Sequence, residues 1–506
     1  MGFNQESRTV NAGKNALSAL TNKTISLVLA FVSRKFFIQY IGVEYLGING
    51  LFANLLTILS LADLGLGTAM NISLYRPIAE NDTEKIAALL GYYKKIYYGI
   101  AAGIFLIGMG FLPFLPYLVN LDSEIPHLTL YYILCVLQNV VSYLFVYKAS
   151  IIKADQKSFL INRIDLYTNI GCVLLQIVSI VAFRSYLVFL LIGILRVAVH
   201  NLTVSLIADR RYAFIKKKVP LDKGEKKEIF SNVSSMFLFK VSYTLINGTD
   251  NILISVLIGT VCVGLYSNYY TLTNNLEAFI ALVFTSMTAG VGNLVVSANA
   301  EKRYQTFRTM QLFSFWLCGY ITVSLFFLLQ DFMQLWFGRE LLLDNLTVTA
   351  IVLNTFFTIS MRPVWTFREG TGMFRRIRFI MLATAALNLL LSVLLGKLLG
   401  LSGILFATSI SKICTYFWYE PKILFRDFFR QKVRHYYGPF LQNLLLIILC
   451  GLICGGILSL FHTVSILSWL LKALICTVVV NGAYALRYRK TREFSELRKK
   501  LRLFAR

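Results

Sequence analysis

Residues 440–461 have the sequence FLQNLLLIILCGLICGGILSLF, a stretch of 22 residues without a charged side chain. A helix rises 1.5 Å per residue, and the hydrocarbon core of a bilayer is about 30 Å thick, so about 20 apolar residues span it. This stretch is therefore long enough to cross a membrane as one helix.

Comparable stretches follow one another along the whole chain. Of its 506 residues, 57% are hydrophobic and 15% are charged, and the mean hydropathy is +0.65. A soluble domain carries about 25% charged residues, so soluble enzymes, DNA-binding proteins and secreted disulfide scaffolds are excluded. We predict an all-α polytopic membrane protein with about 14 transmembrane helices. The predicted spans are residues 15–38, 45–72, 96–118, 128–147, 164–183, 185–207, 229–256, 261–291, 311–331, 346–367, 379–395, 402–420, 440–461 and 466–486.

The positive charge is distributed unevenly between the two sides of these spans. The chain has 50 Lys and Arg against 25 Asp and Glu. With the N-terminus inside, the cytoplasmic segments hold 39 Lys and Arg, while the exterior loops hold three, Arg184, Arg339 and Lys397. The positive-inside rule then places both termini in the cytoplasm. We interpret the basic surface as topology and attraction to membrane lipids, with no nucleic acid as partner.

The longest polar stretch between spans is residues 208–228, which contains eight Lys and Arg. We interpret this stretch as a linker, which divides the chain into four predicted parts. Residues 1–207 form an N-terminal six-helix lobe, 208–228 a basic cytoplasmic linker, and 229–430 a C-terminal six-helix lobe. Residues 431–506 add two further transmembrane helices and a basic cytoplasmic tail.

An internal repeat supports this division. Shifting the sequence by 217 residues aligns 15–85 with 232–302 and gives twelve identities in 71 positions, against about five or six expected by chance. Six spans separate the repeats, so the two lobes have the same topology, and transporters of this kind bind substrate where the lobes meet. The identities include Lys23 with Lys240, Gly42 with Gly259, Gly47 with Gly264, and Glu84 and Lys85 with Glu301 and Lys302.

Eight cationic residues lie inside the predicted spans or at their edges. Each costs about 2.5–3.5 kcal/mol at mid-helix, so each should face a water-filled cavity or a partner. Lys23 lies about 12 Å into its span, and Arg34, eleven residues later, shares its helix face. The eight are Lys23, Arg34, Lys35, Arg196, Lys240, Arg362, Lys412 and Lys472; the intramembrane carboxylates are Asp63, Asp250 and Glu277, with Asp165 near the end of a span.

Two interpretations of these charges stay open. In the structural one, Lys23 pairs with Asp63, Lys240 pairs with Glu277, and Arg34 extends to exterior headgroups. In the functional one, Lys23, Arg34 and Lys240 bind an anionic substrate such as a pyrophosphate in a central cavity. The carboxylates Asp63, Glu277 and Asp250 are then either structural partners or sites for a coupling ion, Na⁺ or H⁺.

Arg362 precedes Pro363, and a proline at that position predicts a kink. We include Arg362 among the candidate substrate-binding cations, with attraction to lipid phosphate as the alternative. We expect Lys412 and Lys472 to reach toward headgroups or to pack within a lobe, and Arg196 is left unassigned. Because cations outnumber carboxylates among the intramembrane charges, an anionic substrate is favoured over a lipophilic cation.

Motifs for catalysis, cofactors and metals are missing from the sequence. The eight Cys form no CxxC, the four His have no metal-ligand spacing, and no nucleotide-binding loop occurs. Our prediction is therefore a protein that is not an enzyme and has no cofactor or metal, apart from a coupling ion.

Two stretches resemble a known family. The first comprises residues 61–70 (LADLGLGTAM), 75–86 (YRPIAENDTEKI) and 92–95 (YYKK). The second comprises residues 368–374 (REGTGMF), Leu387, Asn388, Gly403, Trp418 and Pro421. They resemble the polysaccharide transport family, the lipid-linked oligosaccharide flippases of the multidrug/oligosaccharidyl-lipid/polysaccharide (MOP) exporter superfamily. The resemblance covers most of residues 10–430.

The resemblance implies a flippase of the bacterial cytoplasmic membrane with a cationic cavity. Its substrate would be an undecaprenyl-pyrophosphate-linked oligosaccharide, moved by alternating access for capsule, exopolysaccharide or O-antigen synthesis. A polysaccharide polymerase or glycosyltransferases would be protein partners. The alternatives are a drug or cation antiporter of the multidrug and toxin extrusion (MATE) type and a flippase for the peptidoglycan precursor lipid II.

Overall fold

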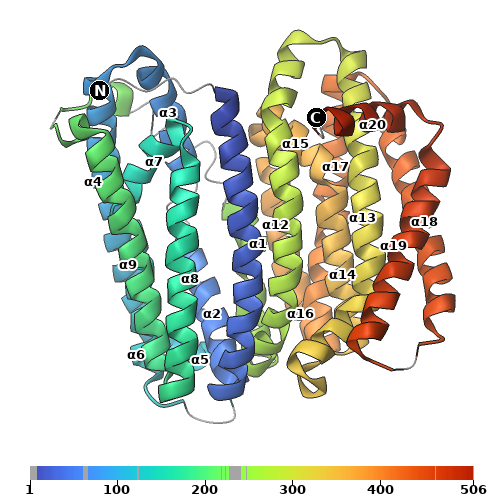
Figure 1. The fold of residues 1–506 in the computed structure, drawn as a ribbon, viewed down its shortest axis with the longest axis horizontal. Helices are drawn as coiled ribbons and strands as arrows, with labels where there is room; N and C mark the ends of the chain where they lie inside the picture. Colours follow the sequence, from blue (N-terminus) through green and yellow to red (C-terminus); the bar gives the residue numbers. More distant parts are fainter. Residues whose placement is uncertain are drawn as a thin grey trace. The chain divides into compact units, whose positions relative to one another are not determined.

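The computed structural model describes residues 8–504 apart from 61–65, 122–124, 218, 223, 227–228, 230–240, 247 and 462. All regular elements in this part of the chain are helices, which confirms the predicted all-α class (Figure 1). The chain divides into two compact units, Met1–Gly264 and Leu265–Arg506. The lobe boundaries expected around residues 208–228 stay a prediction.

Several helices have the length and composition of membrane spans. Seven described helices are long and apolar enough to cross a bilayer, or eight when the bent pair α6 and α7 counts as one span. Their outer faces carry apolar side chains, for example Leu452, whose exposed fraction is 71%. These features support a multi-pass membrane protein, while the count of 14 spans stays a prediction.

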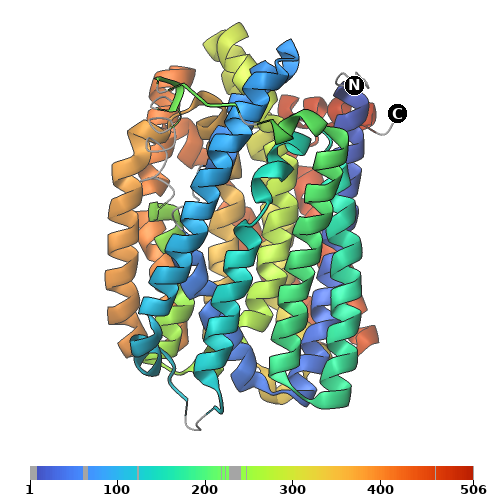
Figure 2. The ribbon, with the colours of Figure 1, turned by 90° about the vertical axis from the view of Figure 1, so that its left-hand side faces the viewer.

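Unit 1 is a bundle of long helices, one of which is broken. Helices α4, α6, α9, α8 and α1 pack in that order, each against the next, and Figure 2 shows them in blue to green. α6 and α7 are bent by 41° at Phe145, which has a φ of 66°. The helices are α1 (Arg8–Tyr40), α2 (Val43–Leu59), α3 (Leu66–Glu80), α4 (Thr83–Gly110), α5 (Leu115–Leu118), α6 (Leu128–Tyr143), α7 (Val146–Ala154), α8 (Ser158–Phe183), α9 (Tyr186–Arg211), α11 (Asp250–Leu257) and the start of α12 (Thr260–Ser297).

Unit 2 is built around α13. This helix packs against α14, α18, α19 and α20, and α18 and α19 lie side by side at one edge of the unit (Figure 1). An aromatic cluster that includes Phe307, Phe367, Phe429 and Tyr436 fills the end of the unit near α17. The helices are α13 (Ala300–Phe337), α14 (Asn345–Ser360), α15 (Arg362–Thr371), α16 (Phe374–Cys414), α17 (Tyr416–Leu424), α18 (Arg434–Leu458), α19 (Ile466–Tyr488) and α20 (Arg492–Phe504).

Two helix breaks in unit 2 follow from single residues. α14 ends at Ser360 and α15 begins at Arg362, with Pro363 in its first turn, so the predicted kink is confirmed as a break. Within α16, Gly400 has a φ of 61° and a ψ of −138°, which only glycine adopts readily. A methyl group on Gly403 would lie 2.0 Å from the carbonyl oxygen of Leu395, so the two halves of α16 pack closely at this turn.

The local structure at the repeated residues is the same at both copies. Gly42 and Gly259 both have positive φ, 111° and 146°, and each directly precedes a helix. Asp82 caps α4 by accepting a hydrogen bond from the backbone of Lys85. Its equivalent, Asn299, caps α13 in the same way, and both distances are 2.9 Å.

The glycines of the repeat also make reciprocal contacts where α2 meets the start of α12. A methyl group on Gly47 would lie 2.0 Å from the carbonyl oxygen of Thr260, and one on Gly264 would lie 2.5 Å from that of Val43. Thr260 is the equivalent of Val43 at the offset of 217 residues. Such symmetric close contacts require glycine at both positions, because any side chain would force the two backbones apart.

Candidate functional site

The first helix is held in unit 1 by a ladder of hydrogen bonds to α8. The α1 residues of the ladder recur every three or four positions, so they lie along one stripe of the helix. The bonds join Asn15 to the backbone of Gln156 and Phe159, Ser18 to Asn162, Asn22 to Asp165 and Ser26 to Asn169, at distances of 2.7–3.1 Å. Interhelical hydrogen bonds of this kind contribute about 0.6 kcal/mol each in membrane proteins.

Asp165 carries the only negative charge of this ladder. Its second oxygen accepts a hydrogen bond from the Arg196 guanidinium of α9 at 2.8 Å, and both side chains are about one-third exposed. Arg196, left unassigned from the sequence, therefore neutralises Asp165 and connects α9 to the α1–α8 pair.

Lys23 and Arg34 lie on a different face of α1 from the ladder. At 3.6 residues per turn, both are about 100° around the helix from the stripe that contacts α8. Both are half-buried, and no described carboxylate forms an ion pair with Lys23. Fixing the ladder stripe against α8 thus determines which way Lys23 and Arg34 face, because a helix cannot rotate without breaking the ladder.

At the end of unit 1 near the ladder's start, the α7–α8 connection holds a buried pair. Lys157, with an exposed fraction of 3%, lies 2.6 Å from the carboxylate of Asp155, which also accepts a hydrogen bond from the Tyr212 hydroxyl at 2.5 Å. Burial, together with the hydrogen bond to Asp155 and its negative charge, raises the pKa of Tyr212 above its ordinary value. The hydroxyl therefore remains a donor, and the cluster anchors this end of the bundle.

In unit 2, two cations gather around one carboxylate. Glu277 of α12 is half-buried and hydrogen-bonds to the side chain of Thr355 on α14. It also interacts electrostatically with Lys412 of α16 and Arg362 of α15. Lys412 has an exposed fraction of only 7%, so of the two roles expected for it, packing within the unit agrees with the structure.

Arg362 connects this cluster to the start of α15. It donates to the backbone carbonyl of Glu277 at 3.5 Å, and its guanidinium carbon lies 5.2 Å from the ring centre of Trp365. The guanidinium is thus held by a carbonyl oxygen and lies against an aromatic ring. The group as a whole carries two positive charges and one negative charge.

The remaining predicted site residues divide into described and undescribed ones. Asp250 is the first residue of α11 and is half-buried. Asp63 and Lys240 lie outside the described residues, so the pairs Lys23–Asp63 and Lys240–Glu277 stay predictions. The described partners of Glu277 are instead on α14, α15 and α16 of its own unit.

Sequence reasoning missed several ion pairs between helices. Lys472 of α19 pairs with Asp331 of α13 at 2.7 Å, and Arg368 of α15 pairs with the fully buried Glu420 of α17 at 3.0 Å. Lys148 of α7 pairs with Asp209 of α9 at 2.8 Å. Asp331 and Glu420 are the last residues of their predicted spans, and opposite charges at span ends are the signal that could have found them.

Comparisons with known proteins identify the fold. The structure is similar to that of the lipid II flippase MurJ in an inward closed conformation, with a TM-score of 0.69 and 14% identity over 94% of this chain and 99% of that one. It is also similar to an inward-facing MATE family multidrug transporter, with a TM-score of 0.60 and 14% identity over 80% of this chain and 97% of that one.

A third similar structure is that of a MOP superfamily transporter from Pyrococcus furiosus, whose binding pocket has reverse polarity. Its TM-score is 0.54 at 14% identity, over 81% of this chain and 94% of that one. No protein-family model and no curated protein matches the sequence. The chain therefore has the fold of MOP superfamily transporters.

Proposed function

We propose that this protein is a flippase that moves a polyprenyl-pyrophosphate-linked oligosaccharide across the bacterial cytoplasmic membrane. The observation that carries the proposal is the fold that it has in common with a lipid II flippase over 94% of the chain. The MATE transporter covers 80%, so the likeness supports a flippase of a lipid-linked substrate over a drug antiporter. Both termini would be cytoplasmic.

The charges support an anionic substrate. Lys23 and Arg34 lie on one face of α1, and Lys23 has no ion-pair partner among the described carboxylates. A unit charge pair at 4 Å is worth about 4 kcal/mol at an effective dielectric constant of about 20. Two such cations facing a diphosphate therefore supply strong binding, whereas a lipophilic cation would need carboxylates.

In the proposed mechanism the pyrophosphate binds Lys23 and Arg34, with Lys240 and Arg362 as further cations. The sugars occupy a hydrated cavity, and the prenyl chain stays in the lipid. A change of state requires that substrate or a coupling ion bind the two conformations with different affinity. Glu277, Asp250 and Asp63 are the candidate sites for Na⁺ or H⁺.

Two flippase substrates fit these arguments. An oligosaccharide repeat unit, for capsule, exopolysaccharide or O-antigen synthesis with a polymerase or glycosyltransferases as partners, follows from the sequence resemblance. Lipid II is the alternative because the structure is similar to that of the lipid II flippase MurJ. A flippase for either substrate would bind the pyrophosphate in a cationic cavity, so only tests with the substrates themselves separate the two.

The test is a deletion strain supplied with wild-type protein, Lys23→Ala, Lys240→Ala or the control Lys153→Ala. Lys153 is an exposed cation at the end of α7. We expect lipid-linked repeat units to accumulate inside the deletion strain, and wild type and Lys153→Ala to restore surface glycan at equal protein level. Lys23→Ala and Lys240→Ala should restore it poorly.

Unchanged glycan and no accumulated intermediate in the deletion strain would contradict the oligosaccharide substrate. In that case, growth of cells depleted of their lipid II flippase, restored by this protein, would assign lipid II instead. If the protein restores neither surface glycan nor the growth of these depleted cells, and instead exports lipophilic cations, it would be assigned as an antiporter.

A further inference from the structure

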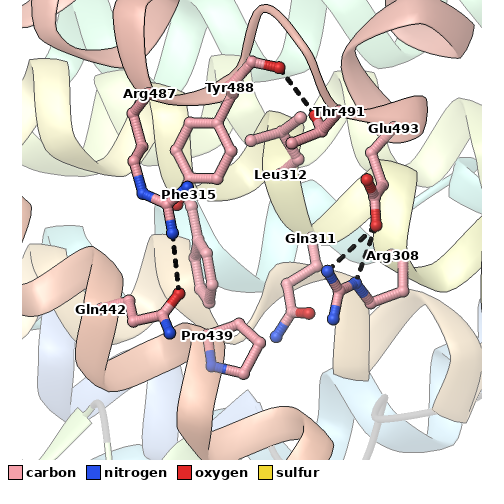
Figure 3. Close-up of a pocket in the computed structure, with 10 residues that line it drawn as sticks. All are labelled: Arg308, Gln311, Leu312, Phe315, Pro439, Gln442, Arg487, Tyr488, Thr491 and Glu493. Carbon is pink, nitrogen blue, oxygen red and sulfur yellow. Dashed lines mark hydrogen bonds and ion pairs between the residues drawn. The ribbon is translucent and has the colours of Figure 1, made fainter.

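A small pocket lies in unit 2 at the end of α19, between α13, α18 and α20 (Figure 3). Its volume is about 110 Å³, whereas a single water needs only about 10–15 Å³. Its lining combines three apolar side chains, Leu312, Phe315 and Pro439, with two guanidinium groups and two side-chain amides. The pocket is therefore amphipathic and large enough for a small polar group with an apolar extension.

Hydrogen-bond donors dominate the polar part of this pocket's lining. Gln311 of α13 has an exposed fraction of 2%, and its Nε2 has no hydrogen-bond partner in the described part of the chain. Leaving such a donor buried without an acceptor costs about 1–3 kcal/mol. Arg487 of α19 donates to Gln442 at 3.3 Å and is otherwise exposed, so it has further N–H groups to offer.

The only described carboxylate lining the pocket is already engaged. Glu493 of α20 pairs with Arg308 of α13 at 3.0 Å. Residues 487–492 (RYRKTR) carry four positive charges in six positions, and of these four side chains only Arg487 lines the pocket. An anion entering the pocket thus meets the Gln311 amide and the Arg487 guanidinium without having to displace a carboxylate from either.

We propose that this pocket binds the phosphate group of an anionic phospholipid from the inner leaflet. The pocket lies where the apolar helices α18 and α19 begin and end, which is the depth of the headgroups. With the C-terminus cytoplasmic, that depth belongs to the inner leaflet. Basic pockets between transmembrane helices on this side are suited to anionic headgroups. The apolar side chains of the lining suit the lipid's glycerol and first acyl carbons, which a free phosphate lacks.

Occupancy of the pocket would also stabilise α20. That helix is seated on α13 by Glu493 with Arg308, by Glu496 with Thr309 at 3.1 Å, and by stacking of Phe494 on Trp316 at 5.8 Å. Arg487 and Thr491 flank the connection from α19 to α20, so a lipid held there ties the end of α19 to α13. The site uses none of the residues proposed to bind the transported substrate and goes beyond that function.

The test measures lipid binding to the purified full-length protein by native mass spectrometry. The probes are phosphatidylglycerol, phosphatidylcholine and inorganic phosphate, and the variants are Arg487→Gln, Gln311→Leu and the control Arg489→Gln. Arg489 is exposed, two residues from Arg487 and outside the pocket lining. We expect Arg487→Gln to weaken phosphatidylglycerol binding about tenfold. Gln311→Leu should weaken it less, and Arg489→Gln should bind it as wild type does.

Three outcomes would overturn the proposal. Equal losses in Arg487→Gln and Arg489→Gln would reduce the effect to general surface charge. Equal retention of phosphatidylcholine and phosphatidylglycerol by wild type would remove the preference for an anionic lipid. Displacement of the lipid by millimolar inorganic phosphate would assign the pocket to a soluble anion. Since Gln311 is buried, the melting temperature of Gln311→Leu is compared with that of wild type before its lipid binding is interpreted.

Discussion

The α1–α8 pair of unit 1 and the α12–α14–α16 group of unit 2 hold their intramembrane charges differently. In unit 1 a ladder of hydrogen bonds holds α1, its one carboxylate, Asp165, is paired with Arg196, and Lys23 has no described carboxylate as an ion-pair partner. In unit 2 both Lys412 and Arg362 interact with Glu277. Among the described residues, one group thus contains a cation without an ion-pair partner, and the other holds its cations around a carboxylate.

This difference separates what the repeat preserves from what it does not. The turn glycines, the close contacts of Gly47 and Gly264 and the helix caps at Asp82 and Asn299 recur with the same geometry. These are backbone features that the bundle needs in both halves. The charges near these features differ in the sequence, since Glu277 stands at the position equivalent to Ser60.

The largest loss of stability should come from the repeated glycines. Gly47→Ala and Gly264→Ala each place a methyl group 2.0–2.5 Å from a backbone carbonyl oxygen, and overpacking costs about 1–3 kcal/mol. We expect a loss near the upper end for both, measured as the free energy of unfolding in SDS titrations. Gly99→Ala, where the added carbon meets nothing within 4 Å, is the control and should lose no stability. Unequal losses at the two glycines would break the symmetry of the contact.

Removing the central carboxylate of unit 2 should have the next largest effect. Glu277→Gln leaves Lys412 and Arg362 without their negative partner, and breaking a buried pair costs about 3–5 kcal/mol. Because Glu277 is only half-buried, we expect about 2 kcal/mol, and about 1 kcal/mol for Thr355→Val, which removes only a hydrogen bond. If Glu277→Gln unfolds like wild type but no longer responds to a proton or sodium gradient, Glu277 is a coupling residue and not a structural partner.

Smaller effects are expected along the α1–α8 ladder. A double-mutant cycle of Asn22→Ala and Asn169→Ala tests two neighbouring positions of the ladder. Asn22 hydrogen-bonds to Asp165 and to Ser26, and Asn169 donates to the same Ser26 hydroxyl. We expect each single variant to lose about 0.6 kcal/mol, in line with interhelical hydrogen bonds in membranes. The measurement is again unfolding in SDS. Losses of several kcal/mol would mean that the ladder, and not apolar packing, holds α1.

The smallest effect on stability is predicted for Lys23. Since it forms no ion pair with a described carboxylate, Lys23→Gln should change the free energy of unfolding by less than about 0.5 kcal/mol. A marked loss of stability, rescued by a matching change at Asp63, would instead support the structural pair. The same variant should be strongly impaired in transport, which is the separation that distinguishes a ligand-binding cation from a structural one.

The sequence was sufficient for the coarse architecture. Long uncharged stretches such as residues 440–461 predict membrane-spanning helices, Pro363 predicts the break between α14 and α15, and the matched glycines predict equivalent turns. Each of these rests on a local property: length, a missing N–H group, or a backbone conformation that needs glycine.

The charge partners could not be predicted from local properties. Lys412 is 135 positions from Glu277 in the sequence, and only the tertiary fold brings the two side chains together. Arg196 and Asp165 likewise meet because α8 and α9 are antiparallel neighbours. Gln311 gave no signal in the sequence, since a single amide at the start of a span is common and its burial depends on α18, α19 and α20.

The central claim is that Lys23 binds the anionic head of a transported lipid. The most direct measurement reconstitutes the purified protein in proteoliposomes and follows a fluorescent undecaprenyl-pyrophosphate oligosaccharide from one leaflet to the other. The proposed role of Lys23 predicts transfer by wild type and by Lys153→Ala, transfer at least about tenfold slower by Lys23→Gln, and partial recovery with Lys23→Arg. Equal transfer rates for Lys23→Gln and wild type would contradict the claim.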